Sequence, residues 1–267
     1  MSSNRLSRVV FGIYLVVFFV YLFAPLIVMS AATFNTSRFP TVTPWQGFTL
    51  QWFVELWHDR AMWNSVWVSV IVAFFVVLTA VPIGTAAALI LTSVHERARG
   101  VLYGFMVSPL LTPGVVVGIA TLVLWRQVGV GGGIFLIILA QSSFIACYVM
   151  LMVAARLQRF DRTQEEAALG LGASKFMVFR RILLPFLRPA LIAAAFLAVL
   201  QSFENYNTTL FVRGLDTPLT IFIASKVRTG LTPAVNALAL TMIVMTILGA
   251  LLYEIIRRRQ RARASVE

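Results

Sequence analysis

The chain of 267 residues contains only one cysteine and two histidines. Cys147 can form no disulfide within the chain, and His58 and His95 fall in loops on opposite sides of the predicted membrane. Membrane-embedded hydrolases need clusters of His, Asp or Glu, or Ser/His pairs. A Gly-Lys-Ser/Thr phosphate loop after a strand is also missing. These absences disfavour an intramembrane enzyme, predict no metal site, and argue against a nucleotide site in this chain.

Charge is scarce too, whereas apolar residues are abundant. Only 12% of the residues are charged and 60% are hydrophobic, too much apolar surface for a soluble fold of this length to cover. About 20 apolar residues cross the hydrocarbon core as a helix. We therefore predict an all-α integral membrane protein with one domain, 1–267, and six transmembrane helices, at 9–32, 63–92, 101–125, 134–155, 189–212 and 234–256.

The first run admits a second interpretation, because Ser30-Ala31-Ala32 follows it like a signal-peptide cleavage site. Its apolar part is too long for a signal peptide and contains Pro25, so an uncleaved span is the better interpretation. In the third run, Pro109 and Pro113 predict a kinked helix, because proline removes backbone donors.

Basic residues are distributed unequally between the loops. With the N-terminus inside, 16 of the 22 Lys and Arg residues lie in the cytoplasm and six outside, which the positive-inside rule favours. We predict a multi-pass membrane protein with both termini cytoplasmic. The basic residues gather at the ends of apolar runs, so membrane topology explains them better than nucleic-acid binding. The tail 257–263 is read as a stop signal or as a contact with anionic lipid headgroups.

The longest cytoplasmic loop, 156–188, is predicted to contain two short helices. Thr163 and Glu166 have the spacing of a capping box, Gly172 can adopt the left-handed conformation that ends a helix, and Ser174 can cap the next one. Pro185 marks the return to the membrane. From these residues alone, an interfacial amphipathic connector that contacts lipid phosphates is an open alternative to a functional element.

The segment 166–185, here called the EAA segment, resembles the EAA loop of ATP-binding-cassette importer permeases. The resemblance rests on the following residues, at the family's spacing: Glu166, Ala167, Ala168, Gly172, Ile182, Leu184 and Pro185. It implies the type I ABC importer permease fold, a location in the bacterial inner membrane, and a loop that docks on a dimer of cytoplasmic ATPase subunits. The permease would then have no catalytic residues or cofactor of its own, because ATP is bound by the partner. An autonomous channel or secondary transporter would leave this segment unexplained.

The fifth predicted span carries a carboxylate, Glu204, with Gln201, Asn205 and Asn207 near it. A carboxylate within a span is costly and therefore a candidate for function. Two interpretations stay open: Glu204 is a structural group paired with a neighbouring helix, or it lines the pathway and attracts a cationic substrate.

A second resemblance, to the spermidine and putrescine branch of importer permeases, favours the cation. It rests on these segments: Ala24-Pro25-Leu26-Ile27, Phe34-Asn35, Trp45-Gln46-Gly47-Phe48-Thr49-Leu50-Gln51-Trp52-Phe53 and Thr232-Pro233 to Asn236-Ala237. Thr33 stands where the branch commonly has Ser. The resemblance implies a polyamine substrate, a second and different permease subunit, and a periplasmic solute-binding protein. Branches for iron, thiamine or opine-like compounds share some of these motifs.

Three aromatic residues in the predicted outer segment, Trp45, Phe48 and Trp52, are candidates for docking that binding protein. Their alternative role is an aromatic belt at the membrane interface, in contact with lipids.

Overall fold

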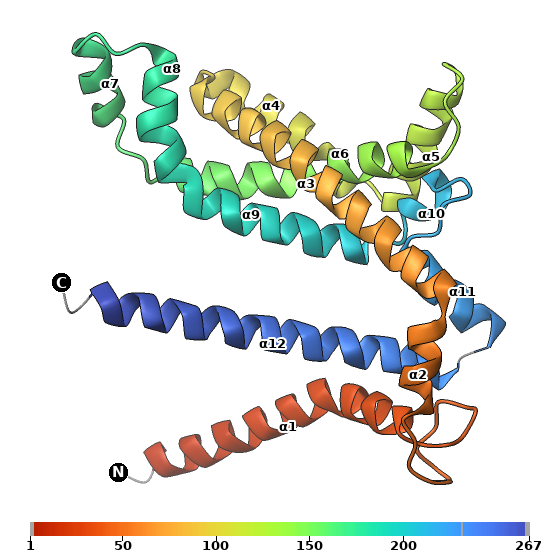
Figure 1. Ribbon diagram of the computed structural model, residues 1–267. Coiled ribbons are helices and arrows are strands. Elements are labelled where there is room, and N and C mark those ends of the chain that lie inside the picture. The colour runs from red at the N-terminus through yellow and green to blue at the C-terminus, as the bar shows by residue number, and fades with distance from the viewer. Residues whose placement is uncertain (1–2, 231, 265–267) are drawn as a thin grey trace. The chain divides into compact units, whose positions relative to one another are not determined.

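A computed structural model describes residues 3–230 and 232–264, and within them it is helical, without strands beyond one isolated bridge between Asn35 and Phe48. The chain folds into two compact units, residues 61–222 and residues 1–60 with 223–267. The prediction of one domain stays a prediction. Figure 1 labels the following helices: α1 (Ser3–Thr33), α2 (Gln51–His58), α3 (Arg60–Ser93), α4 (Glu96–Leu111), α5 (Gly114–Arg126), α6 (Ile134–Leu157), α7 (Thr163–Gly170), α8 (Lys175–Val178), α9 (Leu184–Glu204), α10 (Thr209–Val212), α11 (Leu219–Thr229) and α12 (Pro233–Ala264). A π-helical turn, η1 (Phe179–Leu183), joins α8 to α9.

The terminal unit is built from α1, α2 and α12. Helix α12 contacts both α1 and α2, and the three helices come together near α2 (Figure 1). The most apolar stretch of α1 has none of its residues buried inside the chain. A helix that is apolar all round and packs so little against its own chain is typical of a membrane span.

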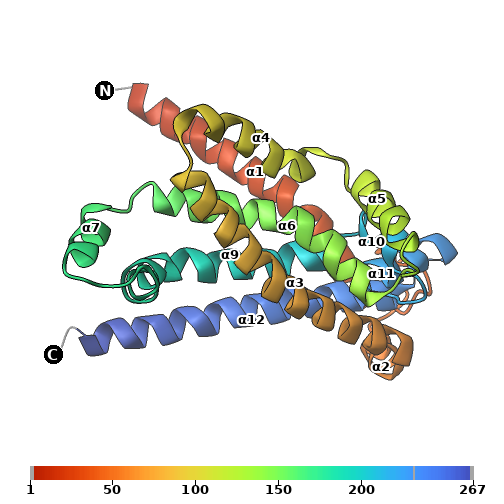
Figure 2. The same ribbon diagram turned by 90° about the horizontal axis from the view of Figure 1, so that it is seen from above.

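The central unit is organised around α6, which packs along α9 and contacts α4, α5 and α10 (Figures 1 and 2). Two apolar clusters fill it, one around Val76 and Ile137 and one around Met150 and Leu187. Helices α3 and α6 approach closely at Gly84, where an added Cβ would lie 2.5 Å from the carbonyl oxygen of Ala146. Small residues at such crossings are what membrane helices use to pack.

Four described helices are long and apolar enough to cross a membrane, and a fifth span results if α4 and α5 are counted as one. The four helices correspond to the first, second, fourth and fifth predicted spans. The bent pair α4 and α5 corresponds to the third. The described apolar part of α12 is shorter, Pro233–Gly249. The all-helical fold is therefore confirmed, whereas the count of six spans stays a prediction.

The third predicted span is broken rather than kinked. Helices α4 and α5 meet at an angle of 97°, and Thr112 between them is extended, with φ −84° and ψ 133°. Pro113 explains the break, since a residue before proline is forced out of the helical region. Pro109 is accommodated inside α4, where the Ser108 hydroxyl donates to the carbonyl of Phe105, the group that loses its usual donor.

The fifth predicted span, 189–212, has different ends in the structure. The helical run begins earlier, at Lys175, and ends at Glu204. Residues 205–208 are not helical, and α10 follows as a separate turn. The Asn205 side chain accepts from the backbone N–H of Thr208 at 3.3 Å, an example of asparagine competing with the helical backbone. Glu204 is thus the last residue of a helix and is exposed, rather than lying inside a continuous span.

Candidate functional site

The loop 156–188 forms the predicted pair of short helices, α7 and α8. The cap of α8 is confirmed, because the Ser174 hydroxyl accepts from the N–H of Met177 at 3.2 Å. The predicted capping box at Thr163 is wrong, since Thr163 is already helical and its N–H donates to the Asp161 carboxylate at 3.0 Å. Hydrogen bonds from the Thr163 side chain and backbone lower the pKa of Asp161, because they favour the ionised carboxylate. The residue at the N-cap position of α7 is Arg162, which makes no side-chain capping bond.

Gly172 ends α7 as predicted. Its φ is +82°, and its N–H donates to the carbonyl of Leu169 while that of Ala173 donates to Ala168. This pair of bonds is the Schellman arrangement, which needs a left-handed residue at the position of Gly172. A Cβ added to Gly172 would meet nothing within 4 Å, so backbone conformation rather than space requires glycine here.

The EAA segment exposes apolar side chains that its own chain does not cover. Leu171 is 90% exposed and Phe176 is 70% exposed. Glu166 and Ala167 of α7 are exposed too, whereas Ala168 is half-buried. Exposed large apolar side chains in a loop predicted to be cytoplasmic are candidates for a surface that binds a partner.

The second half of the EAA segment forms the junction with α9. Ile182 is half-buried in η1, while Leu184 and Pro185 are exposed at the first two positions of α9. Pro185 has no N–H for the carbonyl of Arg181, four residues earlier, and its ring would clash with that group. The π-helical turn that ends at Leu183 gives this carbonyl room. Helices α8 and α9 are thereby continuous, so the loop is joined to a membrane helix without a flexible connection.

A polar pocket of about 220 Å³ lies at the other end of α9. The structure brings together all four residues proposed for the substrate pathway, Gln201, Glu204, Asn205 and Asn207. The remaining lining residues, which were not among the predicted pathway residues, are Gly114, Phe144, Tyr206 and Thr208. Gly114 begins α5, so the two interrupted helices of this unit, α4–α5 and α9–α10, meet at the pocket.

Two contacts that sequence reasoning missed hold the pocket together. Gln141 of α6, buried, accepts from the Ser202 hydroxyl at 2.6 Å and donates to the Thr209 hydroxyl at 2.8 Å, which ties α9 to α10 across the break. Gly118 lies against the backbone of Thr208, where a Cβ would come within 2.6 Å of the carbonyl oxygen. The spacing of Gly114 and Gly118, a small-residue motif of membrane helices, was the available signal.

The candidate docking residues lie in the terminal unit. Trp45 and Phe48 are exposed, whereas Trp52 is only 7% exposed and its indole N–H donates to the carbonyl of Asn35 at 2.8 Å. Trp52 thus packs within the outer segment, whereas Trp45 and Phe48 present their side chains to the outside; the docking role of all three residues stays a prediction.

Asn35 organises the segment that carries these aromatic residues. It is fully buried, and its side-chain amide donates to the carbonyls of Thr41 and Pro44 at 2.9 and 3.1 Å. Its amide oxygen accepts from the N–H of Gln46 at 2.9 Å. Removing a buried side chain with several hydrogen-bond partners costs more stability than removing one surface hydrogen bond, because the partners are left unsatisfied.

Replacing Asn35 by alanine is therefore expected to loosen residues 36–50. Trypsin should cleave the purified protein after Arg38 about tenfold faster, as follows from the loss of about 1.4 kcal/mol of local stability. Gln46→Ala is the matched control, because it removes an exposed amide side chain and keeps the backbone bond to Asn35. Equal cleavage rates for Asn35→Ala and the unmodified chain would contradict this organising role.

In the part of the chain that the structure describes, no group of three or more His, Cys, Asp or Glu side chains is placed to hold a metal ion.

Comparison with known proteins agrees with this architecture. Residues 80–262 match the family described as binding-protein-dependent transport system inner membrane component. The chain is similar to the spermidine/putrescine transport system permease protein PotC of Haemophilus influenzae, 32% identical over 249 residues that cover 92% of this chain and 95% of that protein. It is also similar to the putrescine transport system permease protein PotI of Escherichia coli K12, 33% identical over 254 residues that cover 92% and 90%.

The fold is similar to a chain in a crystal structure of a bacterial alginate ABC transporter in complex with an alginate pentasaccharide-bound periplasmic protein. The TM-score is 0.71 at 16% identity, over 94% of this chain and 93% of that chain. Structural similarity at this identity shows the fold alone, whereas the family match covers more than half of the sequence. The chain therefore belongs to the family of binding-protein-dependent transport system inner membrane components, the multi-pass permeases of ABC importers.

Proposed function

We propose that this chain is one of two permease subunits of an ATP-driven bacterial importer and that its solute is a polyamine or a similar cationic amine. The observation that carries the choice of solute is the polar pocket, where Glu204 is the one charged residue among the described lining residues. Two relatives are named for spermidine and putrescine transport, and both of those compounds are cationic amines.

The pocket has the chemistry to attract an ammonium group. An ammonium offers three donors and no acceptor, and Glu204 offers a carboxylate. The oxygens of Gln201, Asn205 and Asn207 add neutral acceptors around it. Glu204 also stands at the carboxyl end of α9, where the helix dipole favours positive charge. Ends of interrupted helices serve ions in this way in other transporters.

We further propose that the EAA segment docks on a dimer of cytoplasmic ATPase subunits, which bind the ATP. The exposed Leu171 and Phe176 support a partner surface, and the continuous helix from Lys175 to Glu204 supports the transfer of movement toward the pocket. This requires the loop and both termini to be cytoplasmic, as the charge distribution predicts. Trp45 and Phe48 would then face the periplasm and a solute-binding protein, and the pore would pair this chain with a second, different permease.

The substrate proposal is tested by Glu204→Gln in the complete transporter, reconstituted in liposomes with its ATPase, partner permease and binding protein. Uptake of radiolabelled putrescine or spermidine should fall about tenfold, because a neutral amide replaces the carboxylate at a cost of about 1.4 kcal/mol. Assembly with the ATPase should not change.

The matched control is Glu96→Gln, the same change in the first turn of α4. Undiminished uptake by Glu204→Gln would show that Glu204 is structural. Binding of putrescine, spermidine, thiamine and ferric iron to the cognate binding protein separates the substrate classes, and preference for iron or thiamine would exclude the polyamine.

A further inference from the structure

The loop 156–188 is tied to a second membrane helix besides the one that follows it. The Arg162 guanidinium donates to the carbonyl oxygen of Thr92 at 2.7 Å. Arg162 directly precedes α7, and Thr92 is the second-last residue of α3. The contact therefore joins the beginning of α7 to the end of α3, 70 residues earlier in the chain.

The carbonyl of Thr92 is a suitable anchor for a cation. The last carbonyls of a helix have no partner within it, and they carry the negative end of its dipole. The Thr92 hydroxyl does not compete for Arg162, because it donates to the carbonyls of Ala88 and Leu89. Arginine at this position thus satisfies a free acceptor with a charge of the favourable sign.

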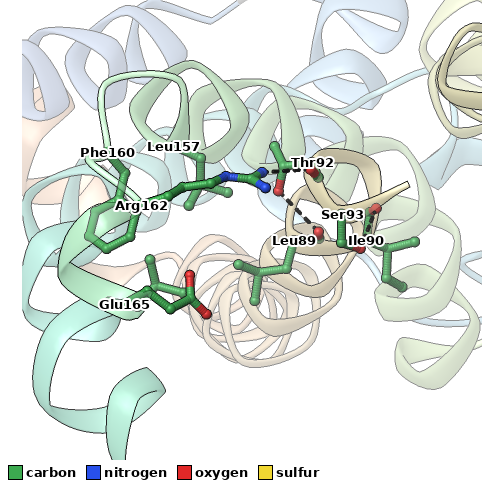
Figure 3. A pocket seen from close by; sticks show the side chains of 9 residues that line it. Leu89, Ile90, Thr92, Ser93, Leu157, Phe160, Arg162 and Glu165 are labelled. Carbon is green, nitrogen blue, oxygen red and sulfur yellow. Dashed lines mark hydrogen bonds between the residues drawn. The ribbon is translucent and has the colours of Figure 1, made fainter. Parts of the chain in front are cut away.

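The contact between Arg162 and Thr92 lies beside a cavity. This cavity of about 370 Å³ separates α7 from α3, with Arg162 and Glu165 on the loop side and Leu89 and Ser93 on the side of α3. Figure 3 shows Arg162 extended along this cavity to Thr92. Side chains that face each other across a cavity are not in contact. Loss of the Arg162 bond is therefore not offset by apolar packing between α7 and α3 at this place.

The base of the loop is fixed independently of Arg162. Arg156, at the end of α6, donates to the carbonyl of Phe186 at 3.3 Å and stacks over its ring, and Phe160 packs on the same ring. These contacts join α6 to α9 and leave out α3. Removing the Arg162 side chain should therefore separate α7 from α3 without releasing the loop.

We propose that Arg162 is a positioning residue that carries movement of α7 into α3. This rests on the proposed docking of the EAA segment on an ATPase. The movement would reach the core by two routes, through η1 into α9 and through Arg162 into α3. Helix α3 passes it to α6, because Gly84 lies against the backbone of Ala146 and the hydroxyls of Thr79 and Ser142 are 2.6 Å apart.

The first test measures ATP hydrolysed per molecule of substrate taken up by the reconstituted transporter. Arg162→Ala should keep ATPase assembly and hydrolysis but raise this ratio about fivefold, the low end of the range for coupling between sites. Arg162→Lys should restore part of the coupling, because an ammonium can still donate to the Thr92 carbonyl. The control is Arg159→Ala, which removes an exposed arginine outside the cavity.

An unchanged ratio in Arg162→Ala would overturn the proposal. So would a parallel loss of uptake, hydrolysis and ATPase assembly, since that result would place Arg162 in the docking surface.

The second test does not depend on transport. Spin labels on Ser93→Cys and Glu165→Cys, in a Cys147→Ser background, report the distance between α3 and α7 in the purified chain. Arg162→Ala should broaden the distance distribution, and an unchanged width would overturn the link. If the complete transporter moves no substrate, the proposed function fails, and the spin-label result still decides whether Arg162 joins the two helices.

Discussion

Replacing Gly172 by valine is expected to reduce uptake to background while the protein stays inserted in the membrane. With φ at +82°, a left-handed conformation costs an ordinary residue about 1–2 kcal/mol and a β-branched residue more. The two hydrogen bonds that end α7 depend on this conformation. A valine would therefore redirect the chain between α7 and α8 and remove the surface proposed to dock on the ATPase. Uptake by the complete transporter, with membrane content measured by immunoblot, checks this result.

Gly170→Val is the matched control, two residues earlier. Gly170 also has open space around an added Cβ, but it is helical and its φ is not positive. Valine suits a helix better than glycine does, so this variant should keep uptake. Full activity of Gly172→Val would contradict the coupling role. Equal loss in both variants would show that bulk at the partner surface, and not the backbone conformation, is what matters.

Adding one methyl group at Gly118 is expected to lower both the thermal stability and the uptake of the transporter. The Cβ of alanine would lie 2.6 Å from the carbonyl oxygen of Thr208, closer than van der Waals contact allows. Since the obstacle is backbone, α5 and residues 205–208 must move apart, at a cost of about 1–3 kcal/mol. These residues line the polar pocket, so uptake should fall by about tenfold or more. Measured together, the melting temperature and the initial rate of uptake check both effects.

Gly104→Ala provides the control in the neighbouring helix α4, where an added Cβ meets nothing within 4 Å. Alanine there replaces glycine in a helix and should stabilise it by about 0.5–1 kcal/mol. Both substitutions replace glycine by alanine in a helix. Opposite changes in melting temperature would therefore be due to the contact with Thr208. If Gly118→Ala were as stable and as active as Gly104→Ala, the close approach of α5 to the pocket would be refuted.

Local pattern predicted the individual helices well and their interruptions less well. Runs of apolar residues located the first, second and fourth predicted spans, because hydropathy reports directly on the cost of burying side chains in lipid. The break at Pro113 lies within an apolar run and the break at Asn205 within a short polar stretch of the fifth predicted span. A hydropathy average over a whole span does not register the change of backbone conformation at either place. Proline suggested the first break, and the helix-competing side chain of Asn205 was the signal for the second.

The candidate sites divide in the same way. Gly172 and Ser174 follow from local backbone rules, and the structure has both in the expected roles. Gln141 and Arg162 do not follow from such rules. Their partners are Thr209 and Thr92, about 70 residues away, and no sequence spacing shows that these side chains meet.

By itself, the sequence determined that the chain is helical and has helices apolar enough to span a membrane. It also determined that the EAA segment forms a helix, a glycine turn and a second helix. Side-chain hydrophobicity, capping and left-handed glycine act over a few residues, so they can be read from neighbours along the chain. Only the tertiary structure decided that Glu204 ends a helix, that two interrupted helices form one polar pocket, and that Arg162 joins α7 to α3. These features depend on close approach between distant segments, which packing and the satisfaction of backbone groups fix only when the chain is folded.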